Sequence, residues 1–328
     1  MQTRVARIYQ YGSPDVIKLE TVSVPQPGPG EVLIEQKACA IHLADSYMRQ
    51  GRYFLKPPLP TVLGLEGIGT VISVGADVKR YKTGDRAAYL FNLGAYADKR
   101  IIPADQLYTP PTELDSETVV VTFVRALTAQ YLLRRIYPIK AGETILIHSA
   151  AGGMGSILSQ WASYIGAKVI GTVSSPDKFI TAENNGCTHV IDYLKEDFSE
   201  AVLDITNGKG VPVVFDAVGA DTYKGNVASL SPRGWFVNYG HASGPPPIDA
   251  IELNQKSLIF TKASLKDYML SPEEKKMMMD EVVKVIKGGH VKLSITGRYE
   301  LADISQAHTD LESRLTTGAL VVAFNNKL

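Results

Sequence analysis

A glycine-rich segment between a predicted strand and a predicted helix constrains the fold of this chain most. The strand covers residues 144–148 (TILIH), the segment covers residues 150–155 (AAGGMG), and a helix-length stretch continues to residue 165. Small side chains let a backbone approach a diphosphate closely, and the first N–H groups of a helix are unpaired donors at a partly positive end. The segment is a variant of the fingerprint that binds dinucleotides, although a simple tight turn would have a similar sequence.

The region around this segment alternates strands with helices. Further strands are predicted at residues 168–173, 189–192, 213–216, 234–238 and 258–261. Six strands that alternate with helices are typical of a parallel, doubly wound Rossmann sheet. The first third of the chain instead has short alternating runs, as at residues 31–37 and 68–74, which indicate a mainly β domain.

The last part of the chain has a mixed pattern. Ser271, followed by a proline and two acids, predicts a helix that begins there and ends at Lys287 before two glycines. Residues 319–324 (ALVVAF) predict a strand that completes the N-terminal β domain.

Composition excludes several classes of protein. The 34 basic and 34 acidic residues balance, so the chain has no overall positive field for nucleic acid or anionic lipid. No apolar run approaches the roughly 18 residues of a membrane span, and the first residues do not resemble a secretory signal. Cys39 and Cys187 are too few for a disulfide framework. We therefore expect a cytoplasmic protein with no membrane span and no nucleic acid as its main partner.

The residues after the second strand favour NADP over NAD. An NAD site usually has an acid about 20 residues beyond the fingerprint, where it holds the ribose hydroxyls. Ser174 and Ser175 stand there in this chain, and Lys178 follows, placed to neutralise a ribose phosphate. Lys178 also has the sequence context of a solvated surface lysine, and the neighbouring Asp177 weakens the electrostatic argument.

Several segments together resemble the zinc-independent quinone oxidoreductases of the medium-chain dehydrogenase/reductase superfamily, the ζ-crystallin-like enzymes. They are residues 64–69 (GLEGIG), 74–75 and 84–86 (VG and GDR), 127–131 (LTAQY), 150–155 (AAGGMG) and 311–314 (LESR), and the resemblance extends over essentially the whole chain. It implies an α/β fold in which a Rossmann doubly wound parallel sheet is inserted into a GroES-like, mainly β catalytic domain. The implied bounds are 1–125 with 266–328 for the GroES-like catalytic domain, and 126–265 for the Rossmann NADP-binding domain.

The resemblance also implies a set of NADPH-binding residues. Lys178, Tyr193 and Arg314 would surround the adenosine phosphate, whereas Thr128 and Tyr131 match positions near the nicotinamide. Packing on the sheet remains an alternative for Tyr193, as do core packing for Tyr131 and an ion pair with Asp310 or Glu312 for Arg314. The complete predicted cofactor-binding set is His42, Asp45, Tyr47, Thr128, Tyr131, Ala151, Gly152, Gly153, Met154, Gly155, Ser174, Lys178, Tyr193, Gly240 and Arg314.

One segment departs from the family pattern, because His42 stands where the family usually has asparagine before Asp45 and Tyr47. The zinc-dependent relatives have a cysteine ligand at this place, so a metal role for His42 has to be considered. Catalytic zinc needs three protein ligands, and the family's second ligand position is Leu65 in this chain. We therefore predict no metal site, and either a hydrogen-bonding role in the pocket or an ordinary half-buried position for His42.

These observations favour an NADPH-dependent quinone reductase. Tyr47, His42 and Tyr53 are the predicted catalytic residues, because tyrosines can stack on a flat conjugated substrate and donate to its oxygen. Loop packing is an alternative for Tyr53. The substrate would be a small quinone, or an enone or enal in the alternative reaction, and a non-catalytic NADPH-binding protein is a third possibility. The family implies a homodimer, and the predicted strand at residues 258–261 offers an edge for pairing.

Overall fold

The computed structural model describes residues 1–313 and 315–324. The chain divides into two compact units: unit 1 combines Met1–Val124 with the segment from Ser294 onward, and unit 2 is Arg125–Leu293. Unit 2 is thus inserted into the sequence of unit 1. None of the described helices combines the length and the apolar character needed to cross a bilayer. The predicted site residue Arg314 lies outside the described residues.

Unit 1 contains two sheets among its described residues. A three-stranded sheet has the order β2-β1-β4, from β2 (Ile17–Ser23), β1 (Gln2–Ile8) and β4 (Thr61–Val62). The larger sheet has the order β15-β16-β3-β5-β6-β8, and β7 also pairs with β3. Its strands are β15 (Ile295–Tyr299), β16 (Ala319–Ala323), β3 (Glu31–Ile41), β5 (Gly67–Val74), β6 (Arg86–Tyr89), β8 (Leu107–Tyr108) and β7 (Lys99–Pro103).

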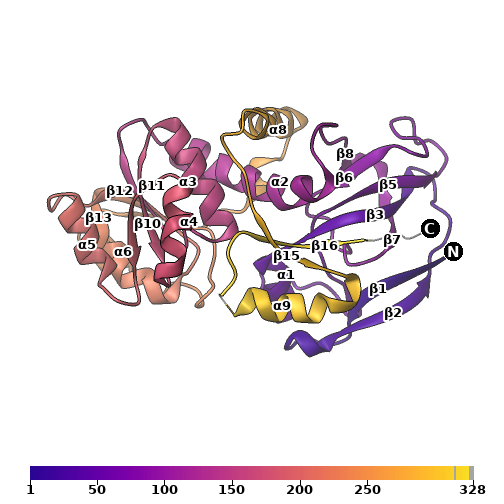
Figure 1. Ribbon diagram of the computed structural model, residues 1–328, viewed down its shortest axis with the longest axis horizontal. Coiled ribbons are helices and arrows are strands. Elements are labelled where there is room, and N and C mark those ends of the chain that lie inside the picture. The colour runs from indigo at the N-terminus through magenta and orange to yellow at the C-terminus, as the bar shows by residue number, and fades with distance from the viewer. Residues whose placement is uncertain (314, 325–328) are drawn as a thin grey trace. The chain divides into compact units, whose positions relative to one another are not determined.

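The C-terminal strand β16 lies antiparallel to β3, with Val321 opposite Ala40. The prediction that the C-terminal strand completes the N-terminal β domain is therefore confirmed, and the two strands can be seen side by side in Figure 1. Among the described residues of unit 1, two α-helices lie wholly within the unit, α1 (Leu43–Arg49) and α9 (Ile304–Glu312). Helix α2 (Ser116–Tyr131) begins in unit 1 and ends in unit 2.

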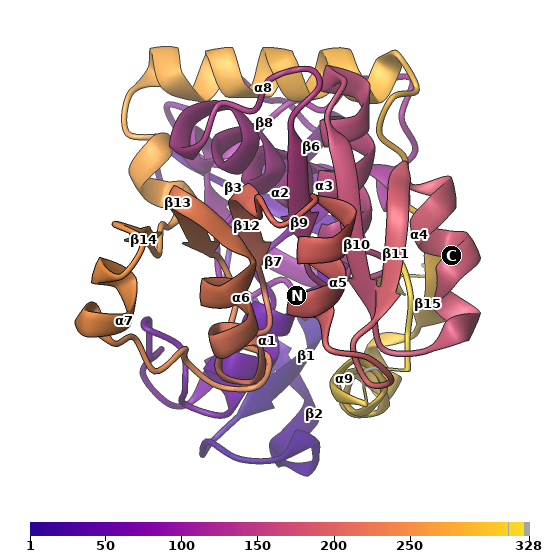
Figure 2. The same ribbon diagram turned by 90° about the vertical axis from the view of Figure 1, so that its left-hand side faces the viewer.

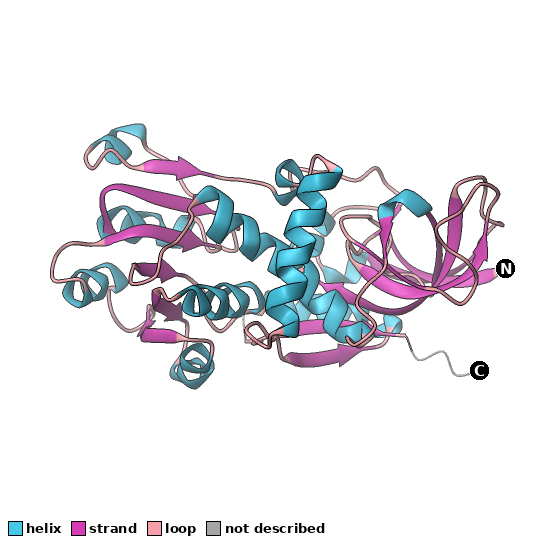
Figure 3. Ribbon diagram, turned by 90° about the horizontal axis from the view of Figure 1, so that it is seen from above, coloured by secondary structure: helices cyan, strands magenta, loops and turns pink. Residues whose placement is uncertain are grey.

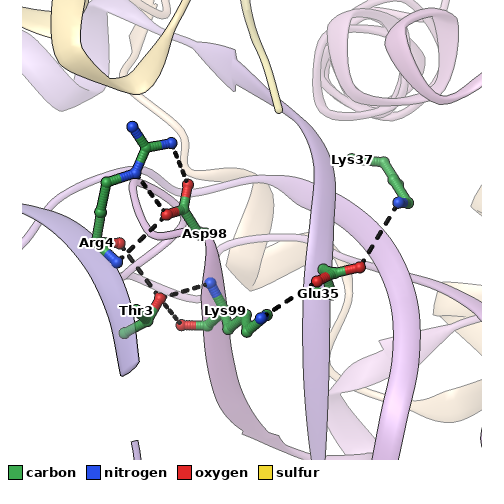
Figure 4. Close-up of polar contacts among 6 residues, drawn as sticks. All are labelled: Thr3, Arg4, Glu35, Lys37, Asp98 and Lys99. Carbon is green, nitrogen blue, oxygen red and sulfur yellow. Dashed lines mark hydrogen bonds and ion pairs between the residues drawn. The ribbon is translucent and has the colours of Figure 1, made fainter. Parts of the chain in front are cut away.

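Polar contacts connect β1, β3 and β7 at one place in unit 1 (Figure 4). Arg4 donates to both carboxylate oxygens of Asp98, at 2.8 and 3.1 Å. The hydroxyl of Thr3 accepts from the N–H of Lys99, and Lys99 also pairs with Glu35 on β3. These contacts hold β1 beside the larger sheet, although exposed ion pairs of this kind contribute only about 1 kcal/mol or less each.

Unit 2 is built on a six-stranded parallel sheet of order β11-β10-β9-β12-β13-β14. The strands are β9 (Thr144–Ile147), β10 (Lys168–Val173), β11 (Cys187–Asp192), β12 (Val211–Asp216), β13 (Leu230–Asn238) and β14 (Ile259–Thr261). Figure 2 shows them side by side. The order reverses between β9 and β12, so the doubly wound Rossmann topology predicted from the sequence is confirmed.

Helices lie on both sides of this sheet (Figure 3). One face buries an apolar cluster that includes Leu146, Ile170, Val214 and Phe236, against α5 and α6. Helix α3 contacts β9 and β10. The helices of unit 2 are α3 (Gly153–Ile165), α4 (Phe179–Asn184), α5 (Phe198–Ile205), α6 (Tyr223–Ser229), α7 (Ala250–Asn254) and α8 (Pro272–Lys287).

Helix α8 begins and ends where the sequence predicted. The Ser271 hydroxyl accepts from the N–H of Glu274 at 3.1 Å, and the helix ends at Lys287. The helix belongs to unit 2, whereas the expected domain bounds placed residues 266–293 with the β domain. Side-chain contacts explain the difference, because Glu274 pairs with Arg135 at 2.7 Å and Glu281 accepts from Gln130 at 2.9 Å.

Candidate functional site

The glycine-rich turn connects β9 to α3 in unit 2. Gly152 is the N-cap of α3, and its N–H donates to the carbonyl oxygen of Ser149 at 2.8 Å. A Cβ added at Gly155 would lie 2.1 Å from the same oxygen, so a side chain there is excluded without a shift of the helix start. The first N–H groups of α3 have no acceptor within the helix. The turn therefore presents unpaired donors at the positive end of a 13-residue helix.

A buried histidine fixes the base of this turn. His148 Nδ1 lies 2.8 Å from Thr172 Oγ1, and His148 Nε2 lies 2.6 Å from Asn226 Oδ1. Burial lowers the pKa of His148, although Asp216 and Asn226 oppose this shift. The imidazole is therefore neutral at pH 7 and acts as a spacer between β10 and α6. We had not predicted any role for it, because its partners lie 24 and 78 residues away in sequence.

Two of the predicted adenosine-phosphate residues, Lys178 and Tyr193, lie where β10 and β11 end. Lys178 is half-buried, and its ammonium donates to the Ser174 hydroxyl at 3.0 Å. Burial lowers the pKa of Lys178, which means that a nearby anion would be favourable. Tyr193 follows β11, and its N–H donates to the carbonyl of Val173 at 3.2 Å. Its ring also packs against the apolar cluster of the sheet, as the packing alternative suggested.

The predicted nicotinamide residues Thr128 and Tyr131 lie on α2, and the predicted cofactor-binding residue Gly240 lies after β13. Thr128 is half-buried, and Tyr131 one turn later is buried with its ring stacked on Tyr268 at 4.8 Å between centroids. Gly240 follows β13. A Cβ added at Gly240 would lie 2.7 Å from the carbonyl oxygen of Ala217. Only glycine therefore lets the chain pass so close to the end of β12.

In unit 1, His42 forms a buried pair with Glu66. His42 Nε2 lies 2.9 Å from Glu66 Oε2, and the other carboxylate oxygen accepts from the N–H of Val124 at 3.2 Å. The side chains of His42 and Glu66 are only 10% and 1% exposed. The backbone N–H of His42 donates to the carboxylate of Asp45 at 2.9 Å, which caps helix α1. We had not predicted Glu66 as a partner of His42, although it stands in one of the segments that carry the family resemblance.

The two candidate tyrosines of unit 1 lie together. The rings of Tyr47 and Tyr53 are stacked with centroids 6.5 Å apart, and Tyr53 also contacts Phe54 at 4.4 Å. Burial, assisted by the Asp45 carboxylate, raises the pKa of Tyr53. Both phenols are therefore half-buried donors beside flat apolar surface, which suits a conjugated carbonyl compound.

Helix α1, which carries Asp45 and Tyr47, is held by a buried network. The Tyr96 hydroxyl donates to Asp45 at 3.1 Å and lies 3.2 Å from His308 Nε2. Since that hydroxyl has one hydrogen, His308 must donate from Nε2, and its Nδ1 faces the Ser46 hydroxyl at 3.3 Å. Burial, followed by the charge of Arg49, lowers the pKa of His308 to about 3. The His308 imidazole is therefore neutral at pH 7, and its contacts with Tyr96 and Ser46 hold the start of α1 in place.

Metal ligands do not gather near His42 in the part of the chain that the structure describes. Residues 1–313 and 315–324 contain no group of three or more histidine, cysteine, aspartate or glutamate side chains placed to hold an ion. Leu65 lies in the apolar core of unit 1, and Cys39 is fully buried. Burial also raises the pKa of the Cys39 thiol well above its usual value, which disfavours a thiolate ligand.

The structure therefore gathers the predicted residues into two sets. His42, Asp45, Tyr47 and Tyr53 are brought together in unit 1. The turn residues, Ser174, Lys178, Tyr193 and Gly240 lie at the carboxyl edge of the sheet in unit 2, whereas Thr128 and Tyr131 lie on the last two turns of α2. A dinucleotide turn at the reversal point of a parallel sheet, inserted into a mainly β unit, defines a medium-chain dehydrogenase/reductase.

Comparisons with known proteins agree with this class. The family model described as alcohol dehydrogenase GroES-like domain matches residues 28–112, and the model described as zinc-binding dehydrogenase matches residues 153–287. A quinone oxidoreductase of Pseudomonas aeruginosa is 41% identical over 95% of this chain and 97% of its own length. A 2-haloacrylate reductase of a Burkholderia species is 39% identical over 97% of this chain and 98% of its own length.

A solved structure extends the similarity to three dimensions. The Escherichia coli quinone oxidoreductase complexed with NADPH has a TM-score of 0.93 and 38% identity, covering 98% of this chain and 100% of that chain. The chain belongs to the quinone oxidoreductase family of the medium-chain dehydrogenase/reductase superfamily. The mainly β unit 1 is accordingly GroES-like, and the fold inferred from the sequence is confirmed.

Proposed function

We propose that this protein reduces quinones with NADPH and without a metal ion. The observation that carries the proposal is the similarity over almost the whole chain to quinone oxidoreductases, one of which was solved with NADPH. The residues of unit 2 fit that cofactor. Gly152 and Gly153 at the start of α3 have no side chains, and a Cβ at Gly155 would lie 2.1 Å from the carbonyl oxygen of Ser149.

Each end of the cofactor has candidate partners. Lys178, Ser174, Tyr193 and Arg314 would hold the adenosine phosphate, because a cation and hydroxyls complement a dianion. Thr128, Tyr131 and Gly240 would border the nicotinamide. When bound, NADPH supplies the hydride, and the protein supplies position and hydrogen bonds.

The substrate would be held by the tyrosines of unit 1. Stacking on Tyr47 and Tyr53 would orient a flat ring, and the Tyr47 hydroxyl would donate to the substrate oxygen as charge develops there. His42 would border the same pocket, with its ring oriented by Glu66 at 2.9 Å. A quinone suits donors of this strength, because the reduced product is a stabilised phenolate that needs no Lewis acid.

A second reaction has a specific observation in its favour. The relative named 2-haloacrylate reductase is 39% identical over nearly the full length, so reduction of an activated carbon–carbon double bond is compatible with this family. We propose enone or enal reduction as the alternative activity of the same site.

One assay tests both reactions. NADPH oxidation is followed by absorbance with benzoquinone, naphthoquinone and an enone as separate substrates. Turnover with the quinones at the highest kcat/KM supports the proposal, and a higher value for the enone favours the alternative. Absence of turnover with all three would contradict both reactions and leave an NADPH-binding protein. Dialysis against a chelator should leave the rate unchanged.

We also propose a homodimer and a cytoplasmic location. Strand β14 is the edge of the unit 2 sheet, and Ile259 on it is 40% exposed, which suits pairing with a second copy. Cys39 and Cys187 are free thiols, which fits a reducing compartment. Sedimentation should show a dimer that Ile259→Lys dissociates, and a monomeric wild type would contradict the assembly.

A further inference from the structure

Two neighbouring apolar side chains are exposed beside the candidate tyrosines of unit 1. Phe54 is 66% exposed and Leu55 is 51% exposed. Both belong to the segment that connects α1 to β4, and Phe54 directly follows Tyr53. Single exposed apolar side chains occur on most protein surfaces, whereas an adjacent exposed pair next to a candidate site indicates a binding surface.

The segment that carries this pair is anchored on both sides. The N–H of Arg52 donates to the carbonyl of Tyr47 at 2.9 Å. The Tyr11 hydroxyl donates to the carbonyl of Pro57 at 2.8 Å, and Pro57 is buried. Phe54 and Leu55 therefore lie on a short stretch between two fixed points, so their exposure is built into the fold.

A continuous row of rings connects Tyr47 to Phe54. The centroids of Tyr47 and Tyr53 are 6.5 Å apart, and those of Tyr53 and Phe54 are 4.4 Å apart. Successive side chains of an extended strand point to opposite sides, so the contact between two consecutive rings requires the chain to bend here. The backbone does bend at residues 53–55. The apolar surface of the tyrosines thus continues outward onto Phe54.

The core closes one direction for a substituent on a ring bound at the tyrosines. Tyr53 packs against the buried apolar cluster of unit 1, which side chains already fill. A substituent would therefore extend toward the exposed side, where Phe54 and Leu55 lie. A hydrocarbon chain is stabilised there because apolar surface is removed from water. The flanking Arg52 and Lys56 are exposed, and their methylene stems can cover such a chain.

We propose that the site takes quinones with a long hydrocarbon tail, which lies along Phe54 and Leu55 while the ring stacks on Tyr47 and Tyr53. Phe54 and Leu55 are then specificity residues that contact the tail. The inference deepens the proposed function and rests on it, since it requires a quinone ring at the two tyrosines.

Two quinones with the same ring isolate the contribution of the tail. They are 2,3-dimethoxy-5-methylbenzoquinone and its 6-decyl derivative, both kept below the concentration at which the decyl compound aggregates. The tail gain is defined as the kcat/KM of the decyl quinone divided by that of the tailless quinone, with NADPH as the reductant. Equilibrium dialysis of both quinones in the presence of NADP⁺ gives the corresponding ratio of dissociation constants without turnover.

Three variants are compared with the wild type. The double variant Phe54→Ser/Leu55→Ser removes the apolar pair, whereas Phe54→Leu keeps an apolar side chain. Leu19→Ser is the matched control, because Leu19 is 44% exposed on β2 of the same unit. All of these side chains are exposed, so the variants should fold, and thermal unfolding checks this.

We expect a tail gain of about tenfold or more in the wild type, since burial of only two CH₂ groups already has an effect of this size. The gain should fall to about threefold or less in the double variant. Phe54→Leu and Leu19→Ser should keep a gain close to that of the wild type. The ratio of dissociation constants should follow the same order.

Other outcomes overturn the inference. An equal tail gain in the wild type and the double variant would place the tail elsewhere, and loss of the gain in Leu19→Ser would show that the effect is not local. If the gain is unchanged but the double variant loses binding to phosphatidylglycerol vesicles, the pair contacts a lipid surface instead. Turnover of the tailless quinone without any tail gain would refute the inference and leave the proposed function intact. Absence of turnover with both quinones would contradict the proposed function itself.

Discussion

Replacement of Lys178 tests the cofactor preference most directly. Lys178→Ala removes a half-buried ammonium that donates to the Ser174 hydroxyl at 3.0 Å and whose pKa is lowered by burial. In the NADPH complex this ammonium would form a charge-assisted hydrogen bond to the ribose phosphate. Bonds of this type contribute about 1.5 to 3 kcal/mol, which corresponds to about a ten- to hundredfold change in binding.

We expect the change in NADPH binding to lie near the lower end of this range. Asp177 is exposed beside Lys178, and Tyr193 and Arg314 would share the same phosphate, so we expect about a tenfold rise in the NADPH dissociation constant. NADH lacks the 2′-phosphate on its adenosine ribose, so its dissociation constant should change by less than about twofold. Lys168→Ala is the matched control, since Lys168 is an exposed lysine at the start of β10.

Fluorescence titration with both cofactors gives the decisive quantity, the ratio of the NADH constant to the NADPH constant. This ratio should fall about tenfold in Lys178→Ala and stay constant in Lys168→Ala. An equal loss for NADH and NADPH would refute the reasoning, because it would show that Lys178 supports the turn rather than the phosphate.

Three further changes test other parts of the structure. Tyr47→Phe should lower kcat for quinones by at least about tenfold and weaken NADPH binding by a smaller factor, and a normal kcat would remove Tyr47 from the mechanism. Gly155→Ala should weaken NADPH binding and destabilise the fold by about 1 to 3 kcal/mol, measured by urea unfolding, because its Cβ would lie 2.1 Å from Ser149. His308 has a folded pKa of about 3 against an unfolded value of 6.5, so its stabilisation is complete above pH 6.5 and is lost as pH falls toward 3. By pH 5 the loss is about 2 kcal/mol, and His308→Gln should lack this slope in urea titrations, whereas an unchanged slope would assign the acid sensitivity elsewhere.

The sequence predicts the fold of unit 2 well because its signals are local. Alternating strands and helices, and small residues directly after a strand, are patterns within a few residues of one another. The start of β13 shows the limit of this reasoning. The strand begins at Leu230, four positions before its predicted start, because a register shift against β12 accommodates Pro232 inside it. Pro232 and Gly234 are residue types that weaken a strand, and both nevertheless lie within β13.

The site was predictable where a family motif carries it and unpredictable where partners are distant in sequence. Glu66 lies 24 residues from His42, and His308 lies 262 residues from Ser46. The neutral state of buried His308 and the pairing of His42 with Glu66 both depend on contacts between residues far apart in sequence. A local sequence pattern cannot predict such contacts.

The position of β16 beside β3 has a consequence for biogenesis. During translation the ribosome releases every residue of unit 2 before β16 emerges, so the inserted Rossmann unit can fold while the sheet of unit 1 still lacks its last strands. Until then residues 38–41 of β3, which are buried and mostly apolar, lack the partner strand on one edge, and such an edge is a template for aggregation. Nascent chains stalled before Ala319 should therefore need chaperone protection for unit 1 alone.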